Sequence, residues 1–377
     1  MTPDVKIGFI PLVDAASLLV AADKGFAADE GLAVELVRDV SWSNMRDRLA
    51  IGHYDAAHLL APMAVASTLG LSHVRVKLVA ALNLAANGNA ITVSRALHAQ
   101  MTQAADGALG NPAVSARALR SVIRDRERRG DDPLTFGMTF PFSTHNYQLR
   151  YWMAEGGIDP DHDLRLVVLP PPYMVDNLAK GQVDGFCVGA PWNAVAADAG
   201  LGVILHPGCA IFHPAPEKTL ALRDDVAARD PQRAAALIRA VMRAADFVRD
   251  PENRAEVAAL LARPDRVGVD AQTIRRTLDG RLDAQARTAQ ADYLLFGDAR
   301  TGRPDPYQAA WLYAQMLRWR QAAFSPEHLR MARAVFDPRF FDAACATAAP
   351  PTPIRAFAGP AFDADDIRAY VAAFGRR

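Results

Sequence analysis

The chain has 377 residues, of which 51% are hydrophobic and 22% charged, and its 42 basic and 42 acidic side chains give a formal net charge of zero. This length fits two lobes, or one domain with a long helical extension. The balanced charge argues against direct nucleic-acid binding, and no window reaches the apolar length of a membrane span. The distant cysteines Cys187, Cys209 and Cys345 indicate neither a zinc site nor a disulfide framework.

The first half of the chain alternates strand-like and helical patterns. VKIGFIPL at 5–12 predicts a strand that follows the N-terminus directly, without a basic leader or an apolar export segment, so we expect a cytoplasmic protein. Asp14 is a predicted N-cap for a helix over 16–24, which Gly25 ends. Further strand and helix patterns follow to residue 94, and this alternation is typical of α/β lobes with mostly parallel sheets.

The pattern restarts near residue 95 and turns mainly helical beyond Thr219. An Arg-rich helix at 115–130 precedes a second strand–helix series, and the Pro- and Ala-rich stretch at 345–362 predicts an extended linker to a last helix. We therefore predict that lobe I comprises residues 1–92 and 215–377, with a helical C-terminal extension wrapping that lobe. Residues 93–214 are the predicted lobe II.

One phrase occurs twice, 129 positions apart. LAIGHYDAAHLLAPM at 49–63 and LAKGQVDGFCVGAPW at 178–192 share Leu-Ala, a Gly, an Asp and a final Ala-Pro. Each copy predicts a helix end, a turn, a buried strand and a new helix that opens at proline. Two such units facing each other would form a cleft at the carboxyl ends of their strands, where helix N-termini attract anions. Alternatively, the phrase is only a convenient helix-to-strand connection.

Four polar residues have positions that fit such a cleft. His145 follows a predicted strand and lies at a helix start capped by Ser143 or Thr144, while Lys218 lies where the chain returns to lobe I and would bring a positive charge to a site with few others. Trp42 offers an indole N–H and Asn89 an amide. Each also has an ordinary structural interpretation: a helix-start polar residue, a solvated lysine, a packed tryptophan, a turn asparagine.

No nucleophile elbow, phosphate loop or metal motif is present in the sequence. His53 and His58 are five residues apart across a predicted turn and strand, so a surface or packing role is expected rather than a metal site. We predict neither a metal nor a cofactor.

Several stretches together resemble the nitrate- and bicarbonate-binding branch of the ABC-transporter solute-binding proteins. They follow one another in the family's order from position 6 to position 321, which is more specific than any one motif. The stretches are IPLVDAASL, SWSNMRDRLAIGHYDAAHLLAPM, ALNLAANGNAITVS, TFPFSTHNYQLRYWMAEGGIDP, LPPPYMVDNLAKGQVDGFCVGAPWN, PEKTLAL and WLYAQMLRWRQ. The resemblance implies a two-lobed periplasmic-binding-protein-like (type II) α/β fold that binds an anion and catalyses no reaction.

The resemblance also implies which residues surround the anion. The implied set is Trp42, Asn89, His145, Pro171, Val188 and Lys218. Nitrate-binding relatives have a glutamine at the position of Asn89, so the reach of this amide differs. Bicarbonate-binding relatives have a carboxylate at the position of Lys218 and recruit calcium. A lysine there therefore favours nitrate or nitrite as the ligand and argues against a metal.

Within this branch, the start of the chain on its first strand resembles the cytoplasmic nitrate/nitrite sensors of bacterial nitrate assimilation. That resemblance implies a partner, an RNA-binding antiterminator with a response-regulator-like domain, which the ligand-free sensor sequesters and the ligand releases. One alternative is the binding component of a nitrate transporter whose export signal has been removed. Another is an enzyme of the pyrimidine-precursor type of thiamine synthesis, which would require a reactive histidine and a cysteine-rich motif.

Overall fold

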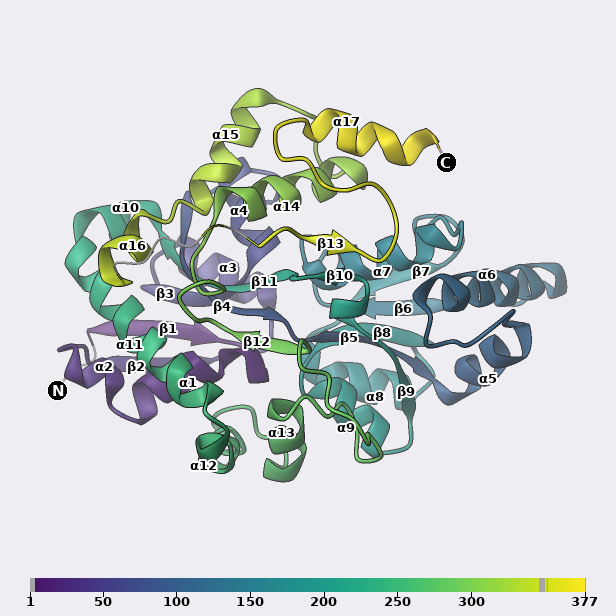
Figure 1. Ribbon diagram of the computed structural model, residues 1–377, viewed down its shortest axis with the longest axis horizontal. Helices are drawn as coiled ribbons and strands as arrows, with labels where there is room; N and C mark the ends of the chain where they lie inside the picture. Colours follow the sequence, from purple (N-terminus) through teal and green to yellow (C-terminus); the bar gives the residue numbers. More distant parts are fainter. Residues whose placement is uncertain (1–3, 346–349, 351, 377) are drawn as a thin grey trace.

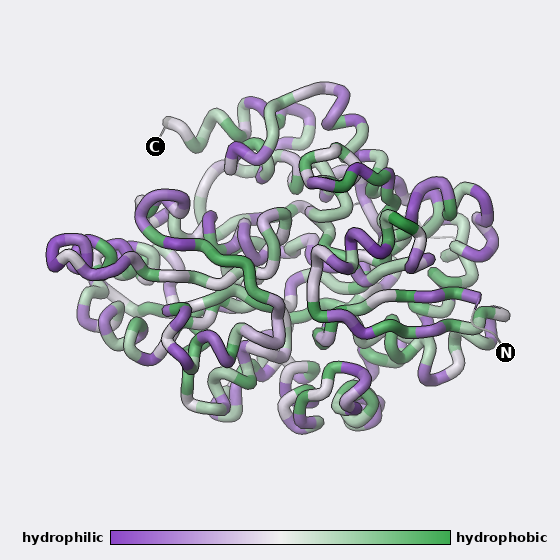
Figure 2. The backbone as a smooth tube through the Cα atoms, turned by 180° about the vertical axis from the view of Figure 1, so that it is seen from behind, coloured by the Kyte–Doolittle hydropathy of each residue, from purple (hydrophilic) through white to green (hydrophobic). Residues whose placement is uncertain are grey.

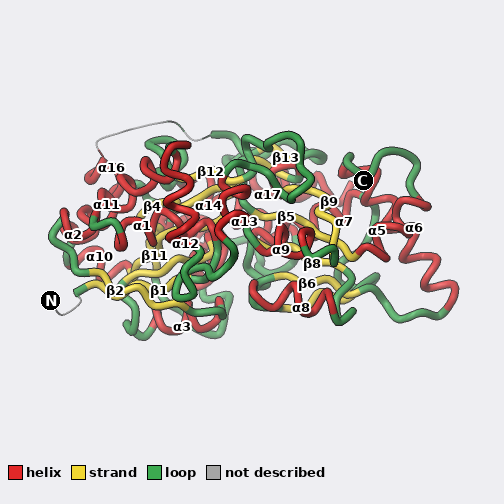
Figure 3. The backbone as a smooth tube through the Cα atoms, turned by 90° about the horizontal axis from the view of Figure 1, so that it is seen from below, coloured by secondary structure: helices red, strands yellow, loops and turns green. Residues whose placement is uncertain are grey.

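The computed structural model describes residues 4–345, 350 and 352–376, and it shows two α/β lobes side by side with a group of helices above them (Figure 1). Each lobe contains its own sheet with helices on both sides (Figure 3). The two-lobed α/β architecture predicted from the sequence is confirmed. None of the helices in these ranges combines the length and the apolar character needed to cross a membrane.

The sheet of lobe I has the strand order β12-β4-β11-β3-β1-β2. Strand β1 pairs in parallel with β2 and β3, whereas β11 runs antiparallel to both β3 and β4, and β12 antiparallel to β4. The strands are β1 (Val5–Phe9), β2 (Val34–Arg38), β3 (Ala56–Leu60), β4 (Leu78–Asn87), β11 (Pro216–Arg223) and β12 (Leu294–Phe296).

The sheet of lobe II has the order β7-β6-β8-β5-β9, with β6 parallel to β7 and β8, and β5 antiparallel to β8 and β9. The strands are β5 (Asn89–Ser94), β6 (Thr135–Met138), β7 (Arg165–Val168), β8 (Gly185–Gly189) and β9 (Gly202–Pro207). The expectation of mostly parallel sheets is wrong. In both lobes the strands that carry the chain from one lobe to the other pair antiparallel with their neighbours, which makes each sheet mixed.

The chain passes from lobe I to lobe II at Asn87 and Gly88, both in the left-handed region with φ of 62° and 88°. Strand β5 therefore begins at Asn89 in the sheet of lobe II, and the predicted boundary at 92/93 falls inside this strand. An Asn-Gly pair allows such a turn because neither residue pays the full penalty for positive φ. The return crossing ends at β11, which starts at Pro216 in the sheet of lobe I.

The repeated phrase forms matching units in the two lobes. Its first copy ends helix α3, forms β3 and opens α4, and its second copy ends α8, forms β8 and opens α9. Pro62 is the second residue of α4, but Pro191 is the N-cap of α9 rather than its first residue. The helices of these units are α3 (Trp42–Ala50), α4 (Ala61–Leu69), α8 (Met174–Ala179) and α9 (Trp192–Asp198).

Serine side chains cap the starts of α3 and α7, and of the two candidates predicted for the second helix, Ser143 is the cap. The Ser41 hydroxyl accepts from the Asn44 N–H at the start of α3, and the Ser143 hydroxyl accepts from the Asn146 N–H at the start of α7. The remaining helices of lobe II are α5 (Arg95–Ala104), α6 (Pro112–Arg129), α7 (Thr144–Glu155), η2 (Pro171–Tyr173) and η3 (Gly208–Ala210).

Apolar side chains cover both faces of the lobe I sheet. One core lies between this sheet and helices α1 and α11, while a second lies on the opposite face, beneath α4 and α14, and continues into lobe II. In Figure 2 the strands at the centre of each lobe are largely hydrophobic, whereas the outer end of lobe II around α5 and α6 is hydrophilic. The helices before the extension are η1 (Val13–Ala15), α1 (Ala16–Asp23), α2 (Phe26–Asp29), α10 (Asp224–Arg229), α11 (Pro231–Arg249), η4 (Pro251–Asn253), α12 (Arg254–Leu261) and α13 (Ala271–Leu278).

The C-terminal extension contacts both lobes, so the prediction that it wraps lobe I alone is wrong. Strand β13 pairs with β10, and the Tyr151 hydroxyl of α7 in lobe II donates to the Ala358 carbonyl at 2.7 Å. The rings of Phe357 and Phe374 pack against Tyr151. Within the predicted linker, residues 346–349 and 351 lie outside the described residues. The elements here are β10 (Phe212–His213), α14 (Pro306–Arg318), α15 (Pro326–Val335), α16 (Arg339–Cys345), β13 (Arg355–Ala356), α17 (Ile367–Ala372) and η5 (Ala373–Arg376).

Candidate functional site

A group of buried polar side chains lies between the two sheets, where the crossing strands β5 and β11 meet the starts of α3 and α7. Each is at most 2% exposed, which is rare for ionisable groups unless they are paired. We call this group the interlobe cluster; its members are Asp14, Trp42, His58, Asn89, His145, Gln148, Glu217 and Lys218.

Two adjacent residues of β11, Glu217 and Lys218, both belong to the interlobe cluster. In a regular strand neighbouring side chains point to opposite faces. Here the pairing of β11 with β4 shifts register on both sides of Lys218, which is the signature of a β-bulge. The irregular backbone therefore allows the carboxylate of Glu217 and the ammonium of Lys218 to contact each other at 2.7 Å.

Lys218 is paired with two carboxylates. Its Nζ lies 2.9 Å from Asp14 Oδ2 as well as 2.7 Å from Glu217 Oε1, and 5.6 Å from the centre of the Trp42 ring. Burial alone would lower the pKa of Lys218, but the two carboxylates raise it above its usual value, so the ammonium is charged. The expectation that this lysine acts in a site with few other charges is wrong.

Asp14 is an ion-pair partner and not a helix cap. It lies in η1, where no side-chain cap is formed, and its Oδ1 is 3.0 Å from His58 Nε2. Burial would raise the pKa of Asp14, but Lys218 and His58 outweigh burial and hold it well below its usual value. Asp14 is therefore ionised, and burial lowers the pKa of His58, which favours the neutral imidazole.

Glu217 connects the two lobes within the cluster. Its Oε2 accepts from Asn89 Nδ2 at 2.7 Å, and its Oε1 lies 3.4 Å from His145 Nδ1. Burial raises the pKa of Glu217, and Lys218 offsets this only in part. Burial, together with the charge of Lys218, holds the pKa of His145 well below its usual value.

Lobe II contributes uncharged donors and acceptors. The Asn89 amide also donates to Gln148 Oε1 at 3.0 Å, and Cys187 Sγ lies 3.6 Å from the same oxygen. The Thr139 hydroxyl lies 3.1 Å from His145 Nδ1. Gly208 makes room for Gln148, because a Cβ at position 208 would lie 2.4 Å from Gln148 Nε2.

Six side chains of the cluster carry buried polar atoms that have no hydrogen-bond partner within the described parts of the chain. Those of Asp14 and His58 lie within ion-pair distance of each other or of Lys218, which leaves four side chains whose atoms have no partner of either kind. The atoms are Trp42 Nε1, Asn89 Oδ1, His145 Nε2 and Gln148 Nε2. Buried polar groups in proteins are nearly always paired, and each unpaired one costs about 1–3 kcal/mol. Such a concentration in one place, supplied by both lobes, is what a site for a small polar ligand requires.

The structure brings four of the six residues implied by the sequence into one cluster: Trp42, Asn89, His145 and Lys218. Val188 is placed differently, because its side chain packs in a small core with Met174 and Leu178, while its carbonyl accepts from Asn193 Nδ2 at 2.7 Å. The neighbouring Cys187 is the β8 side chain that faces the cluster. Pro171 is buried at the start of η2, beyond the carboxyl end of β7.

Sequence reasoning missed four members of the cluster: Asp14, His58, Gln148 and Glu217. Glu217 directly precedes Lys218, and this pairing of opposite charges in an otherwise apolar strand was the available signal. His53 and His58 do not act as a pair, because His53 is exposed and His58 is buried. No group of three or more metal-ligating side chains occurs in residues 4–345, 350 and 352–376.

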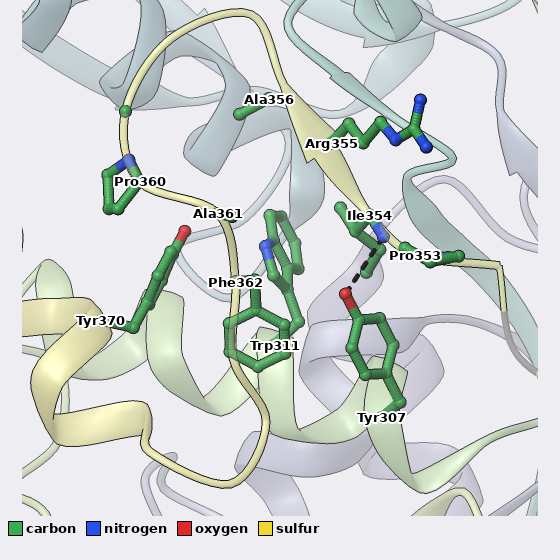
Figure 4. A pocket seen from close by; sticks show the side chains of 11 residues that line it. Tyr307, Trp311, Pro353, Ile354, Arg355, Ala356, Pro360, Ala361, Phe362 and Tyr370 are labelled. Carbon is green, nitrogen blue, oxygen red and sulfur yellow. Dashed lines mark hydrogen bonds between the residues drawn. The ribbon is translucent and has the colours of Figure 1, made fainter.

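A hollow of about 390 Å³ lies in the C-terminal extension, between α14 and residues 353–362 (Figure 4). It is lined mainly by aromatic and proline side chains, among them Trp311, Phe362 and Tyr370. Its Tyr307 hydroxyl accepts from the Ile354 N–H at 3.2 Å. Arg355 is its one charged lining residue, so this hollow lacks the convergent polar groups of the interlobe cluster.

Comparisons with known proteins agree with this architecture. Residues 1–262 match a family described as NMT1-like. The chain is 34% identical over 348 residues to the nitrate import ATP-binding protein NrtC of Synechocystis sp., covering 91% of the chain and 50% of that protein. It is 32% identical over 326 residues to the nitrate/nitrite binding protein NrtA of Nostoc sp., covering 84% and 71%. The chain thus spans about half the length of the ATP-binding relatives it matches.

Among solved structures, the crystal structure of the periplasmic nitrate-binding protein NrtA from Synechocystis PCC 6803 superposes with a TM-score of 0.88 at 26% identity, covering 99% of this chain and 100% of that one. A zinc-bound ligand-binding component of an ABC-type import system from Staphylococcus aureus superposes with a TM-score of 0.67 at 16% identity, covering 91% and 99%, and shows the shared fold. The fold is therefore that of the periplasmic binding proteins.

Proposed function

The chain belongs to the NMT1-like family, and we propose that it binds nitrate or nitrite in the interlobe cluster. The observation that carries this proposal is the set of unpaired polar atoms beside a buried ammonium, Lys218. Nitrate is small and planar and accepts hydrogen bonds in several directions. The N–H groups of an indole and of side-chain amides next to an ammonium can donate hydrogen bonds to the nitrate oxygens. The nitrate-binding names of the relatives and of the structural neighbour support this choice of anion.

The expected binding geometry uses both lobes. Lys218 and Trp42 belong to lobe I, whereas Gln148 and His145 lie on the first turns of α7 in lobe II. An anion between them would hydrogen-bond to both lobes at once. Binding would then stabilise the arrangement in which the lobes are in contact.

Other contacts already join the lobes next to the cluster. The Val13 N–H donates to the Ala190 carbonyl at 2.9 Å, and Trp192 Nε1 donates to the Pro11 carbonyl at 3.1 Å. The Thr144 hydroxyl donates to the Pro216 carbonyl at 2.6 Å. These bonds surround η1 and β11, which carry Asp14 and Lys218, so occupancy of the cluster and the contact between the lobes are expected to depend on each other.

A catalytic role for the cysteines finds no support. Burial raises the pKa of Cys187 well above its usual value and that of Cys209 to about 11, so both thiols are protonated near neutral pH and are poor nucleophiles. The relatives reported above are named as binding and transport proteins, which also favours binding over catalysis.

Calorimetric titration tests the binding proposal. The full chain is titrated separately with nitrate, nitrite, bicarbonate and chloride. We expect saturable one-to-one binding of nitrate or nitrite and much weaker binding of chloride, which offers no planar set of acceptors. Failure of nitrate and nitrite to bind at millimolar concentrations would contradict the proposal.

The finer proposal is that the chain is a cytoplasmic sensor that reports anion binding to a protein partner. The ligand-free form would sequester an RNA-binding antiterminator with a response-regulator-like domain, and the anion would release it. The support is the expected coupling between anion binding and the contact of the two lobes, through which the ligand can change the affinity for a partner. Since a ligand acts only through differential affinity, a coupling of about 2 kcal/mol would change partner affinity roughly thirtyfold.

The alternative is a binding component of a nitrate transporter, and the transport names of the relatives favour it specifically. A pull-down with and without nitrate separates the two. A sensor loses its partner when nitrate is added, and the partner is RNA-binding. A transport component instead associates with membrane permease subunits when nitrate is bound.

A further inference from the structure

With both carboxylates ionised, the interlobe cluster carries more negative than positive charge before any anion enters. Lys218 is the one cation in contact with two carboxylates, Asp14 and Glu217. The other titratable groups that face them are His58 from β3, His145 from α7 and Cys187 from β8, and each of these is favoured in its neutral form. A monovalent anion placed beside an ionised Glu217 would thus be an unpaired buried charge, which is strongly unfavourable.

The hydrogen on His145 decides whether this side chain attracts or repels an anion. His145 Nδ1 lies 3.1 Å from the Thr139 hydroxyl and 3.4 Å from Glu217 Oε1. With Glu217 ionised, the favourable tautomer places the hydrogen on Nδ1, because the carboxylate oxygen can only accept and the hydroxyl oxygen can also accept. The other nitrogen, Nε2, then presents a lone pair. Nε2 is also the ring atom that has no partner within the described residues, and a lone pair there would face the anion with the wrong polarity.

One added proton reverses this arrangement. If the proton resides on Glu217, the carboxylic acid donates to Nδ1 and the ring hydrogen moves to Nε2. If it resides on His145, both ring nitrogens carry hydrogen. In either case Nε2 becomes a donor toward the anion. The added proton also cancels the negative charge of the Glu217–His145 pair, so this pair no longer competes with the anion for the positive charge of Lys218.

We propose that a monovalent anion enters the interlobe cluster together with one proton from solvent, which the Glu217–His145 pair holds, and that Glu217 thereby sets the pH range in which the protein binds its ligand. This inference rests on the proposed function. Asp14 does not take the proton, because contacts with both Lys218 and His58 stabilise its ionised carboxylate. The burial that raises the pKa of Glu217 makes this carboxylate the easier of the two to protonate.

The sign of the pH dependence follows from linkage. When the ligand-bound form holds one more proton than the free form, affinity falls as pH rises, and the slope approaches a tenfold increase in Kd per pH unit. We expect this slope for nitrate over the pH range in which Glu217 is ionised in the free protein and the Glu217–His145 pair is protonated in the bound form.

The test is calorimetry of the full chain with sodium nitrate at one pH in HEPES and in Tris, whose ionisation enthalpies differ, followed by Kd measurements across the pH range. We expect uptake of about one proton per nitrate bound. An unchanged Kd across the range, with equal heats in the two buffers, would overturn the proposal. Absence of any nitrate binding is a different result and would instead contradict the proposed function.

Two variants identify which carboxylate the proton uptake depends on. Glu217→Gln keeps the size of the side chain and mimics its protonated state, so proton uptake should disappear and Kd should become independent of pH. Asp14→Asn removes the other carboxylate and should retain the uptake. Loss of uptake in Asp14→Asn but not in Glu217→Gln would show that the pair does not hold the proton. If either variant fails to fold, the proton count of the parent protein still decides whether binding is proton-coupled.

Discussion

The two lobes contribute different chemistry to the same cluster. Lobe I supplies the charged side chains of Asp14, Glu217 and Lys218, while lobe II supplies groups that are neutral before the ligand binds, from Asn89, His145 and Gln148. The repeated phrase builds similar walls on both sides, yet the two walls carry different side chains. Lobe I thus fixes the charges of the site, and lobe II adds hydrogen-bond donors and acceptors. Recognition of the anion therefore requires both lobes.

The largest effect is expected from removing the single cation of lobe I. Lys218→Met retains much of the side-chain length but leaves two buried carboxylates uncompensated. We expect nitrate binding to fall by more than about 100-fold and the free energy of unfolding to fall by about 3–5 kcal/mol. Calorimetry and urea unfolding measure these two quantities.

The matched control is Lys180→Met, because Lys180 is exposed at the end of α8 in lobe II. It should change neither affinity nor stability measurably. Wild-type nitrate affinity in Lys218→Met would refute the assignment of positive charge to lobe I.

Removing a neutral donor of lobe II should have the next largest effect. His145→Leu eliminates a side chain that we expect to hydrogen-bond to the charged ligand. The expected loss is about 1.5–3 kcal/mol of binding free energy, or roughly ten- to 150-fold in Kd. A loss as large as that of Lys218→Met would show that the two lobes do not divide charge and hydrogen bonding as proposed.

A smaller effect is expected for the one neutral donor of lobe I, Trp42. Trp42→Phe removes the indole N–H, which has no partner among the described residues, and keeps an aromatic ring. Nitrate affinity should fall about three- to tenfold, and the free energy of unfolding should fall only through the packing lost with the smaller ring, since no protein hydrogen bond is lost.

Trp152→Phe is the control for Trp42→Phe, because the indole N–H of Trp152 is hydrogen-bonded within the protein. Trp152 Nε1 donates to Ser115 Oγ at 2.9 Å and to the Pro112 carbonyl at 3.1 Å in the core of lobe II. This variant should lose stability by about 1 kcal/mol and keep its nitrate affinity. Equal behaviour of the two variants would mean that unpaired N–H groups do not mark the site.

The smallest effect is expected from added bulk where the lobes meet. In Gly189→Ala the new methyl would lie 3.4 Å from Asp14 Oδ2 and 3.6 Å from Asn89 Oδ1. The first distance is at the lower limit of ordinary van der Waals contact and the second lies within that range, so we expect folding to persist and Kd to rise by about two- to fivefold. Gly110→Ala, with no neighbour within 4 Å of the new Cβ, is the control and should be silent.

Much of the fold was predictable because its signals are local. The period of apolar residues identified the strands and helices, and the capping role of Ser143 was readable from its position before a helix. The predicted lobe boundary at 92/93 lay within a few residues of Asn87-Gly88, where the structure places the crossing between the lobes. The mixed direction of the sheets was not readable, because pairing between strands far apart in the chain has no local pattern.

The site was only partly predictable for the same reason. Lys218 was expected to act as an isolated charge because its partner Asp14 is 204 positions away and had a satisfactory local interpretation as a helix cap. Glu217 was overlooked because alternation along a regular strand would point it away from Lys218. The bulge in β11 decided otherwise.

The sequence by itself determined the α/β alternation and the duplicated helix–strand–helix unit, and through a family resemblance it implied six residues around an anion. Only the tertiary structure decided that one lysine is ion-paired with two carboxylates and that the imidazole of His145 lies beside one of them, Glu217. It also decided that the C-terminal extension contacts both lobes. The physical reason is that secondary structure follows from neighbours in the chain. The charge state and hydrogen-bond polarity of a buried group instead depend on whatever the fold places within about 3–4 Å of it.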